Sequence, residues 1–193
     1  MSPAAPATAV GARLLRTYFD CRYGQLHVHQ AIPPGGGFDE ATALLCLPGR
    51  PGLGRFFDAL LGPLGTNRSI YAPDLPGCGG SDAPPGALGP TQYAYALLDL
   101  LDSLRQRRVD VLAQGAGTAT ALALVTLRPG LVRRIAISPA DGANLAAAQR
   151  SGLAVREFAL AGADEFPAAP APTRAQLHEL LEFLGADAPA GNK

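Results

Sequence analysis

The feature that most constrains the fold is a regular alternation of short apolar runs with longer amphipathic segments. Residues 42–47 and 68–74 have the composition of buried strands, and the segment 53–64 between them has helical periodicity. A second predicted helix, over 91–107, precedes an apolar strand over 109–113. A strand–helix–strand unit that repeats in this way builds a mostly parallel, doubly wound α/β sheet with helices on both faces.

The other predicted elements complete this sheet. Segments 16–20 and 25–32 flank the Tyr23-Gly24 turn with alternating residue types, which predicts an antiparallel hairpin at one edge. After strand 109–113 the chain continues with a helix ending near Leu127, a strand, a short Ala-rich turn of helix, another strand and a last helix. The final strands and helix are expected over 133–138, 155–161 and 173–184.

Length and composition limit the architecture to one domain. The 193 residues, 48% of them hydrophobic, are enough for a single core. We expect a flexible N-terminal tail over 1–15, one domain over 16–185 and a C-terminal tail over 186–193. Cys21, Cys46 and Cys78 have none of the paired spacings of zinc or redox motifs, so structural thiols are expected.

Charge and hydropathy exclude several function classes. Sixteen Lys and Arg balance sixteen Asp and Glu, so no basic surplus favours nucleic acid or anionic lipid as a partner. The longest apolar stretch, 116–127, is shorter than the ~20 residues that span a bilayer. The N-terminus lacks the basic and apolar regions of a secretory signal. These observations predict a soluble cytoplasmic protein without a membrane partner.

The segment YAPDLPGCGGSDAPP (71–85) resembles the loop after the fourth strand of the α/β-hydrolases. Four further segments resemble the family in the same order. They are LLCLPGRPG (its third strand and oxyanion loop), VDVLAQGAGTATALAL (its nucleophile elbow), RPGLVRRIAISPA (its sixth strand) and ALAGADEFPAAP to LLEFLG (its C-terminal strand and helix). The resemblance covers about 17–185 and implies a shortened α/β-hydrolase fold without the lid domain.

The elbow motif departs from the family at its reactive position. A Gly-x-nucleophile-x-Gly turn lifts the nucleophile above the sheet and points a helix N-terminus at the oxyanion. Here Ala113 and Gly117 keep the small flanking residues, Gln114 precedes the reactive position, and Gly115 occupies it without a side chain. The oxyanion loop reads Pro48-Gly49-Arg50, so the resemblance implies backbone donors at Arg50 and Ala116 beside Gly49.

The general base is also altered. The resemblance places Glu165 where the family has its His, with Asp164 beside it as an acid, and a carboxylate with an ordinary pKa near ~4 is a poor base for a hydroxyl. If 155–167 is instead the family's seventh strand, which ends in an acid, then Asp164 or Glu165 is that acid. We interpret the segment as the last strand.

The three histidines are interpreted as structural or exposed. His27 and His29 alternate on a strand expected to lie far from the strand carboxyl ends, and His178 lies in the last helix. No metal site and no cofactor is therefore predicted.

These observations favour a catalytically impaired hydrolase relative that binds a small molecule or associates through an exposed edge as a homodimer, or a decayed gene product. One alternative is an active hydrolase of a small ester with a displaced nucleophile, the candidates being Thr118, Ser81, Ser138 and Cys78. A second alternative is a dinucleotide site at Gly115-Ala116-Gly117, although Thr120 takes the third small position.

Overall fold

The computed structural model describes residues 11–36, 41–138, 142–158 and 172–185, and these residues form a seven-stranded sheet. The sheet order is β1-β2-β4-β3-β5-β6-β7. The pairs from β4 through β7 are parallel, whereas β1–β2 and β2–β4 are antiparallel. The strands are β1 (Arg13–Cys21), β2 (Gly24–Ile32), β3 (Ala43–Leu47), β4 (Ile70–Pro73), β5 (Val109–Gln114), β6 (Val132–Ser138) and β7 (Ala154–Glu157). The predicted mostly parallel sheet is confirmed.

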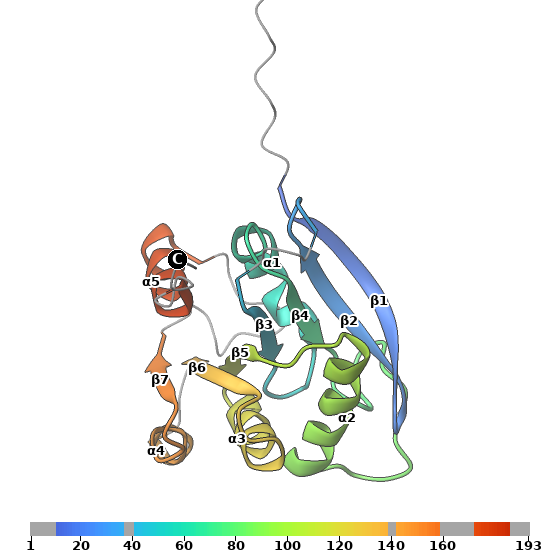
Figure 1. Ribbon diagram of the computed structural model, residues 1–193. Helices are drawn as coiled ribbons and strands as arrows, with labels where there is room; N and C mark the ends of the chain where they lie inside the picture. Colours follow the sequence, from blue (N-terminus) through green and yellow to red (C-terminus); the bar gives the residue numbers. More distant parts are fainter. Residues whose placement is uncertain (1–10, 37–40, 139–141, 159–171, 186–193) are drawn as a thin grey trace, which may run out of the picture.

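Helices cover both faces of the sheet (Figure 1). In the view of Figure 1, α1 and α5 lie above the sheet and α2, α3 and α4 lie below it. The helices on each side of the sheet bury a separate apolar cluster against the face that they cover. The helices are the 3-10 turn η1 (Gly54–Phe57), α1 (Asp58–Leu64), α2 (Pro90–Ser103), α3 (Gly117–Leu127), α4 (Gly142–Gln149) and α5 (Arg174–Gly185).

The N-terminal hairpin forms the sheet edge as predicted, but its register corrects one expectation. β1 begins at Arg13 rather than Arg16. Gly24, where the hairpin turn meets β2, adopts φ +106°. Because β2 is antiparallel to β4, its first half lies alongside the end of β4, with Val28 opposite Pro73. His27 and His29 therefore lie near the carboxyl end of β4, and the prediction that they lie far from the strand ends is wrong.

Two helices differ from the predicted ranges for local reasons. The helix expected over 53–64 divides into η1 and α1. At the start of η1 the chain passes β4 closely, since a Cβ at Gly54 would lie 2.1 Å from the Ala72 carbonyl oxygen. The helix expected to reach 107 ends at Ser103, since Arg105 adopts a left-handed φ of +54°.

The C-terminal segment packs onto the sheet beside β6. β7 pairs in parallel with β6, and it ends at Glu157; the later part of the predicted strand lies outside the described residues. On α5, Leu180 and Leu184 are buried in the cluster that contains Phe158. The α5 carboxyl end is held by Arg133, whose Nη2 donates to the Leu184 carbonyl oxygen at 2.8 Å.

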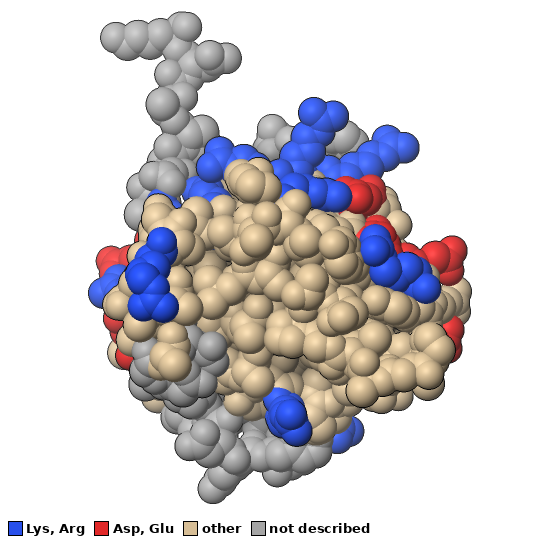
Figure 2. Space-filling view, turned by 90° about the horizontal axis from the view of Figure 1, so that it is seen from below, with Lys and Arg blue, Asp and Glu red and all other residues tan. Residues whose placement is uncertain are grey.

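The face formed by the lower helices carries few charges. α3 and α4 contain no Lys, Arg, Asp or Glu. Figure 2, seen from below Figure 1, shows a broad uncharged surface with charged residues mainly around its rim. No helix among the described residues combines the length and apolar character needed to cross a bilayer.

Close backbone packing at the start of α3 generates the first prediction. A Cβ at Gly117 would lie 2.4 Å from the Leu47 carbonyl oxygen, and a backbone atom cannot move away easily. We expect Gly117→Ala to lower the free energy of unfolding by about 1–3 kcal/mol in urea denaturation. The control is Gly62→Ala in α1, where a Cβ meets nothing within 4 Å, and which should stabilise by up to ~1 kcal/mol. Equal stabilities of the two variants would contradict the packing argument.

Candidate functional site

The strand-to-helix turn after β5 has the conformation of a nucleophile elbow. β5 ends at Gln114, Gly115 adopts φ +46°, and α3 begins at Gly117. The Gly115 amide donates to the Ser138 carbonyl oxygen at 3.1 Å, which fixes the turn against β6. A Cβ at Gly115 would meet nothing within 4 Å. The space for a nucleophilic side chain is therefore present, but this residue supplies no reactive atom.

The loop after β3 is packed directly onto this elbow. The Gly49 amide donates to Oε1 of Gln114 at 2.7 Å, and the Gly52 amide donates to the Gly49 carbonyl at 2.6 Å. A Cβ at Gly49 would lie 2.3 Å from the same Oε1. Gln114 thus ties the elbow to the loop, and Gly49 is needed for their close approach.

The two predicted oxyanion donors flank one cavity. Arg50 and Ala116 both line a cavity of about 450 Å³ beside the elbow. Within the described ranges, neither backbone amide donates a hydrogen bond inside the protein. Arg50 is the charged residue of the lining, which is otherwise mostly apolar. The lining consists of Pro48, Gly49, Arg50, Pro51, Gly52, Leu75, Cys78, Leu88, Pro90, Tyr93, Ala116 and Thr120.

The Gly-rich loop after β4 is organised around the buried carboxylate of Asp74. Asp74 Oδ1 accepts the Gly54 amide at 2.7 Å, and Oδ2 accepts the Gly80 amide and pairs with His27 Nδ1, both at 2.9 Å. Ser81 Oγ accepts the His27 amide at 2.9 Å and donates to the Asp74 carbonyl at 2.8 Å. The segment with the strongest family resemblance therefore holds the cavity wall in place.

Of the four displaced-nucleophile candidates, one lines the cavity. Thr118 and Ser138 are fully buried, and the Ser81 hydroxyl is already used in the Asp74 network. Cys78 is half-buried and lines the cavity. Burial raises the pKa of the Cys78 thiol, and the Asp74 carboxylate raises it further, so the unreactive thiol form is favoured.

The predicted base and acid, Glu165 and Asp164, lie outside the described residues. His178 is exposed on α5, with Nδ1 3.7 Å from a Glu182 oxygen. His27 and His29 lie together beside Asp74, a grouping that the sequence analysis missed. The signal in the sequence that could have revealed this grouping is an H-x-H pattern on β2 together with an Asp directly after β4, the strand that pairs with β2.

The glycines of the elbow do not have the environment of a phosphate-binding turn. Gly117 packs so closely against the Leu47 carbonyl that a side chain would not fit there. Thr120 is buried at the cavity wall. A dinucleotide site needs its glycines for close approach of the pyrophosphate to the backbone. The packing of Gly117 against β3 therefore disfavours that alternative.

Many solved structures resemble this chain in fold. They include epoxide hydrolase CorEH without ligand (TM-score 0.59, 20% identity, 65% of this chain and 42% of that one). Haloalkane dehalogenase DbeA from Bradyrhizobium elkani gives a TM-score of 0.58 at 24% identity over 65% and 42% of the two chains. Cfl2 wild-type from Burkholderia cenocepacia gives a TM-score of 0.57 at 26% sequence identity, over 67% of this chain and 42% of that chain.

The chain therefore spans about two fifths of the length of these structures. No curated protein sequence matches it significantly. The model of the alpha/beta hydrolase family matches residues 44–191, a range that includes all of β3 but its first residue, the Asp74 loop, the elbow and α5. With the strand order and the elbow in place, this match shows that the chain belongs to the α/β-hydrolase family.

Proposed function

We propose that this protein is a binding member of its family that has lost covalent catalysis. The observation that carries the proposal is Gly115, which holds the elbow conformation at φ +46° with open space around its Cβ position and no side chain. An α/β-hydrolase of the usual kind needs a nucleophilic atom at this point. Without one, what remains is binding and oxyanion stabilisation.

The cavity fits a small, mostly apolar molecule with one hydrogen-bond acceptor. Its volume of about 450 Å³ lies within the ~300–1,000 Å³ of small-molecule sites. The unused amides of Arg50 and Ala116 suit a carbonyl oxygen, and the Arg50 guanidinium adds attraction for a partial negative charge. The described part of the connection from β6 to β7 contains α4, and none of its residues lines this cavity.

An active hydrolase with Cys78 as a displaced nucleophile is the second candidate, because this thiol faces the cavity. Its raised pKa and the carboxylate beside it oppose nucleophilic attack, which requires the thiolate.

Location and association belong to the same proposal. We place the protein in the cytoplasm, with a small molecule rather than nucleic acid or membrane as its ligand. β7 pairs with β6 on one side, and its four residues are mostly exposed. This edge and the uncharged face of α3 and α4 are the surfaces at which a homodimer would form.

The loss of the nucleophile predicts chemical silence. The wild-type protein should hydrolyse p-nitrophenyl acetate no faster than a heat-denatured control, and a fluorophosphonate probe should not label it. Gly115→Ser is the matched variant, since no atom lies within 4 Å of a Cβ at this position and the change restores a hydroxyl. Probe attachment to this variant alone would show that the elbow still presents its side chain. Stoichiometric labelling of the wild-type protein would refute the proposal.

The binding role predicts saturable shifts in NMR spectra on addition of acetophenone, an uncharged carbonyl compound of suitable size. Ala116→Trp should fill the cavity rim and weaken binding at least about 10-fold, which corresponds to ~1.4 kcal/mol. The control, Ala175→Trp, changes an exposed position on α5 away from the cavity lining and should bind normally. Equal affinities of the two variants would place the ligand elsewhere.

The raised pKa of Cys78 predicts slow alkylation. At pH 8, iodoacetamide should modify Cys78 in the native protein at least about 10-fold more slowly than in urea, because less thiolate is present. Peptide mass mapping identifies the modified residue, and Cys78→Ser is the control. Modification faster than that of free cysteine would indicate an activated thiol and favour the displaced-nucleophile alternative.

A further inference from the structure

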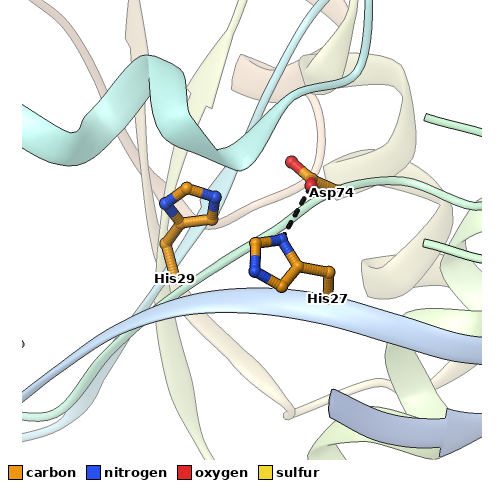
Figure 3. Close-up of side chains that lie close together, drawn as sticks. All are labelled: His27, His29 and Asp74. Atoms are coloured by element: carbon orange, nitrogen blue, oxygen red, sulfur yellow. Dashed lines mark hydrogen bonds and ion pairs between the residues drawn. The ribbon is translucent and has the colours of Figure 1, made fainter. Parts of the chain in front are cut away.

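His27 and His29 form a compact pair of imidazoles on one face of β2. They are separated by one residue, so their side chains share a sheet face, and their ring centroids lie 4.8 Å apart in an edge-to-face arrangement. Figure 3 shows both rings beside Asp74, with His29 directing a ring edge toward the space between His27 and the carboxylate. Neither imidazole belongs to the cavity at the elbow.

Each imidazole is oriented by its own carboxylate. His27 Nδ1 lies 2.9 Å from Asp74 Oδ2, and His29 Nδ1 lies 2.7 Å from Asp58 Oδ1. Asp58 is itself held by Arg16, whose Nη2 donates to the other carboxylate oxygen at 2.9 Å. Asp58 on Nδ1 of His29 fixes that imidazole and leaves its second nitrogen, Nε2, as a ligand, which is the arrangement found around metal-binding histidines. His27 instead turns Nδ1 itself toward Asp74, so an ion bound by both residues would replace the hydrogen bond between them.

The cluster is buried and drawn from two separate segments. The side chains of His27, His29 and Asp74 are 14%, 7% and 4% exposed. One possible ligand atom from each of the three residues lies within 4.8 Å of the other two. The residues come from β2 and from the loop after β4, and Asp58 comes from the start of α1. The backbone amides of Gly54 and Gly80 hold the Asp74 carboxylate in position.

We propose that His27, His29 and Asp74 bind a divalent transition metal, with Zn²⁺ the best match to two imidazole nitrogens and one carboxylate oxygen. Asp58 is a positioning residue that orients His29. Zinc at ~2.0–2.1 Å from each ligand brings ligand atoms to about 3.4 Å from one another, so small side-chain rotations must close the cluster. Water would complete the coordination. This site is independent of the proposed function and replaces the expectation of no metal.

Such a site would clamp the hairpin to the Asp74 loop. β2 belongs to the edge hairpin, whereas Asp74 anchors the loop that forms the cavity wall. An ion that binds this arrangement in the folded chain but not in the unfolded one raises the stability of the fold. Metal binding should therefore be visible as stabilisation, without any assay of enzymatic activity.

The test is a titration of the full-length, chelator-treated protein with CoCl₂, followed by displacement with ZnCl₂. We expect one equivalent of Co²⁺ to give visible absorption bands of a low-symmetry site, and Zn²⁺ to remove them and to raise the melting temperature. His29→Gln should abolish both effects. His178→Gln, which removes the exposed histidine on α5, is the matched control and should bind normally.

A second variant keeps the test decisive if His29→Gln fails to fold. Asp58→Asn changes a partly exposed position, and loss of its orienting role should weaken Co²⁺ binding by about 10–100-fold with unchanged circular dichroism. The proposal is overturned if the wild-type protein shows no saturable binding, or if Co²⁺ binds the His29→Gln or Asp58→Asn protein as tightly as the His178→Gln protein. Failure here leaves the tests of acetophenone binding and of ester hydrolysis unaffected.

Discussion

The buried carboxylate of Asp74 is the interaction on which the carboxyl-end loops depend. It accepts hydrogen bonds from the amides of Gly54 and Gly80 and pairs with His27, so one side chain joins the start of η1, the Gly-rich loop and the hairpin strand β2. A buried charge is tolerated only when it is hydrogen-bonded in this way. Removal of the Asp74 carboxylate would leave the two buried amides without an acceptor, and the loop that forms the cavity wall would lose its anchor.

A second constraint is the close contact between the elbow and its neighbours. Gly117 packs against the Leu47 carbonyl and Gly49 against Gln114, whereas Gly115 touches nothing in the direction of a side chain. Gly117 and Gly49 thus serve packing, whereas a side chain at position 115 would serve chemistry alone. A chain can therefore lose its nucleophile without losing the turn, which explains how the fold and the elbow persist around Gly115.

Apolar periodicity predicted the order of the strands and helices along the chain, because β3 is apolar along its whole length and most residues of the buried strand β5 are apolar. Family resemblance predicted the elbow at Gly115. Periodicity did not predict the cluster of His27, His29 and Asp74, because it depends on pairing between β2 and β4 across more than forty residues of sequence. The contact of Arg133 with the Leu184 carbonyl was missed for the same reason.

Among the described residues, no lid domain is present beside the cavity, and this openness limits how tightly the cavity could hold the proposed ligand. Hydrogen bonds from the Arg50 and Ala116 amides would form in competition with water, so each contributes about 0.5–1.5 kcal/mol rather than the larger value of a dry site. Apolar contact with Leu75, Leu88 and Tyr93 must then supply most of the affinity, at ~25 cal/mol per Å² of buried surface. Selectivity in such a site follows the shape of the cavity more than the charge of the ligand.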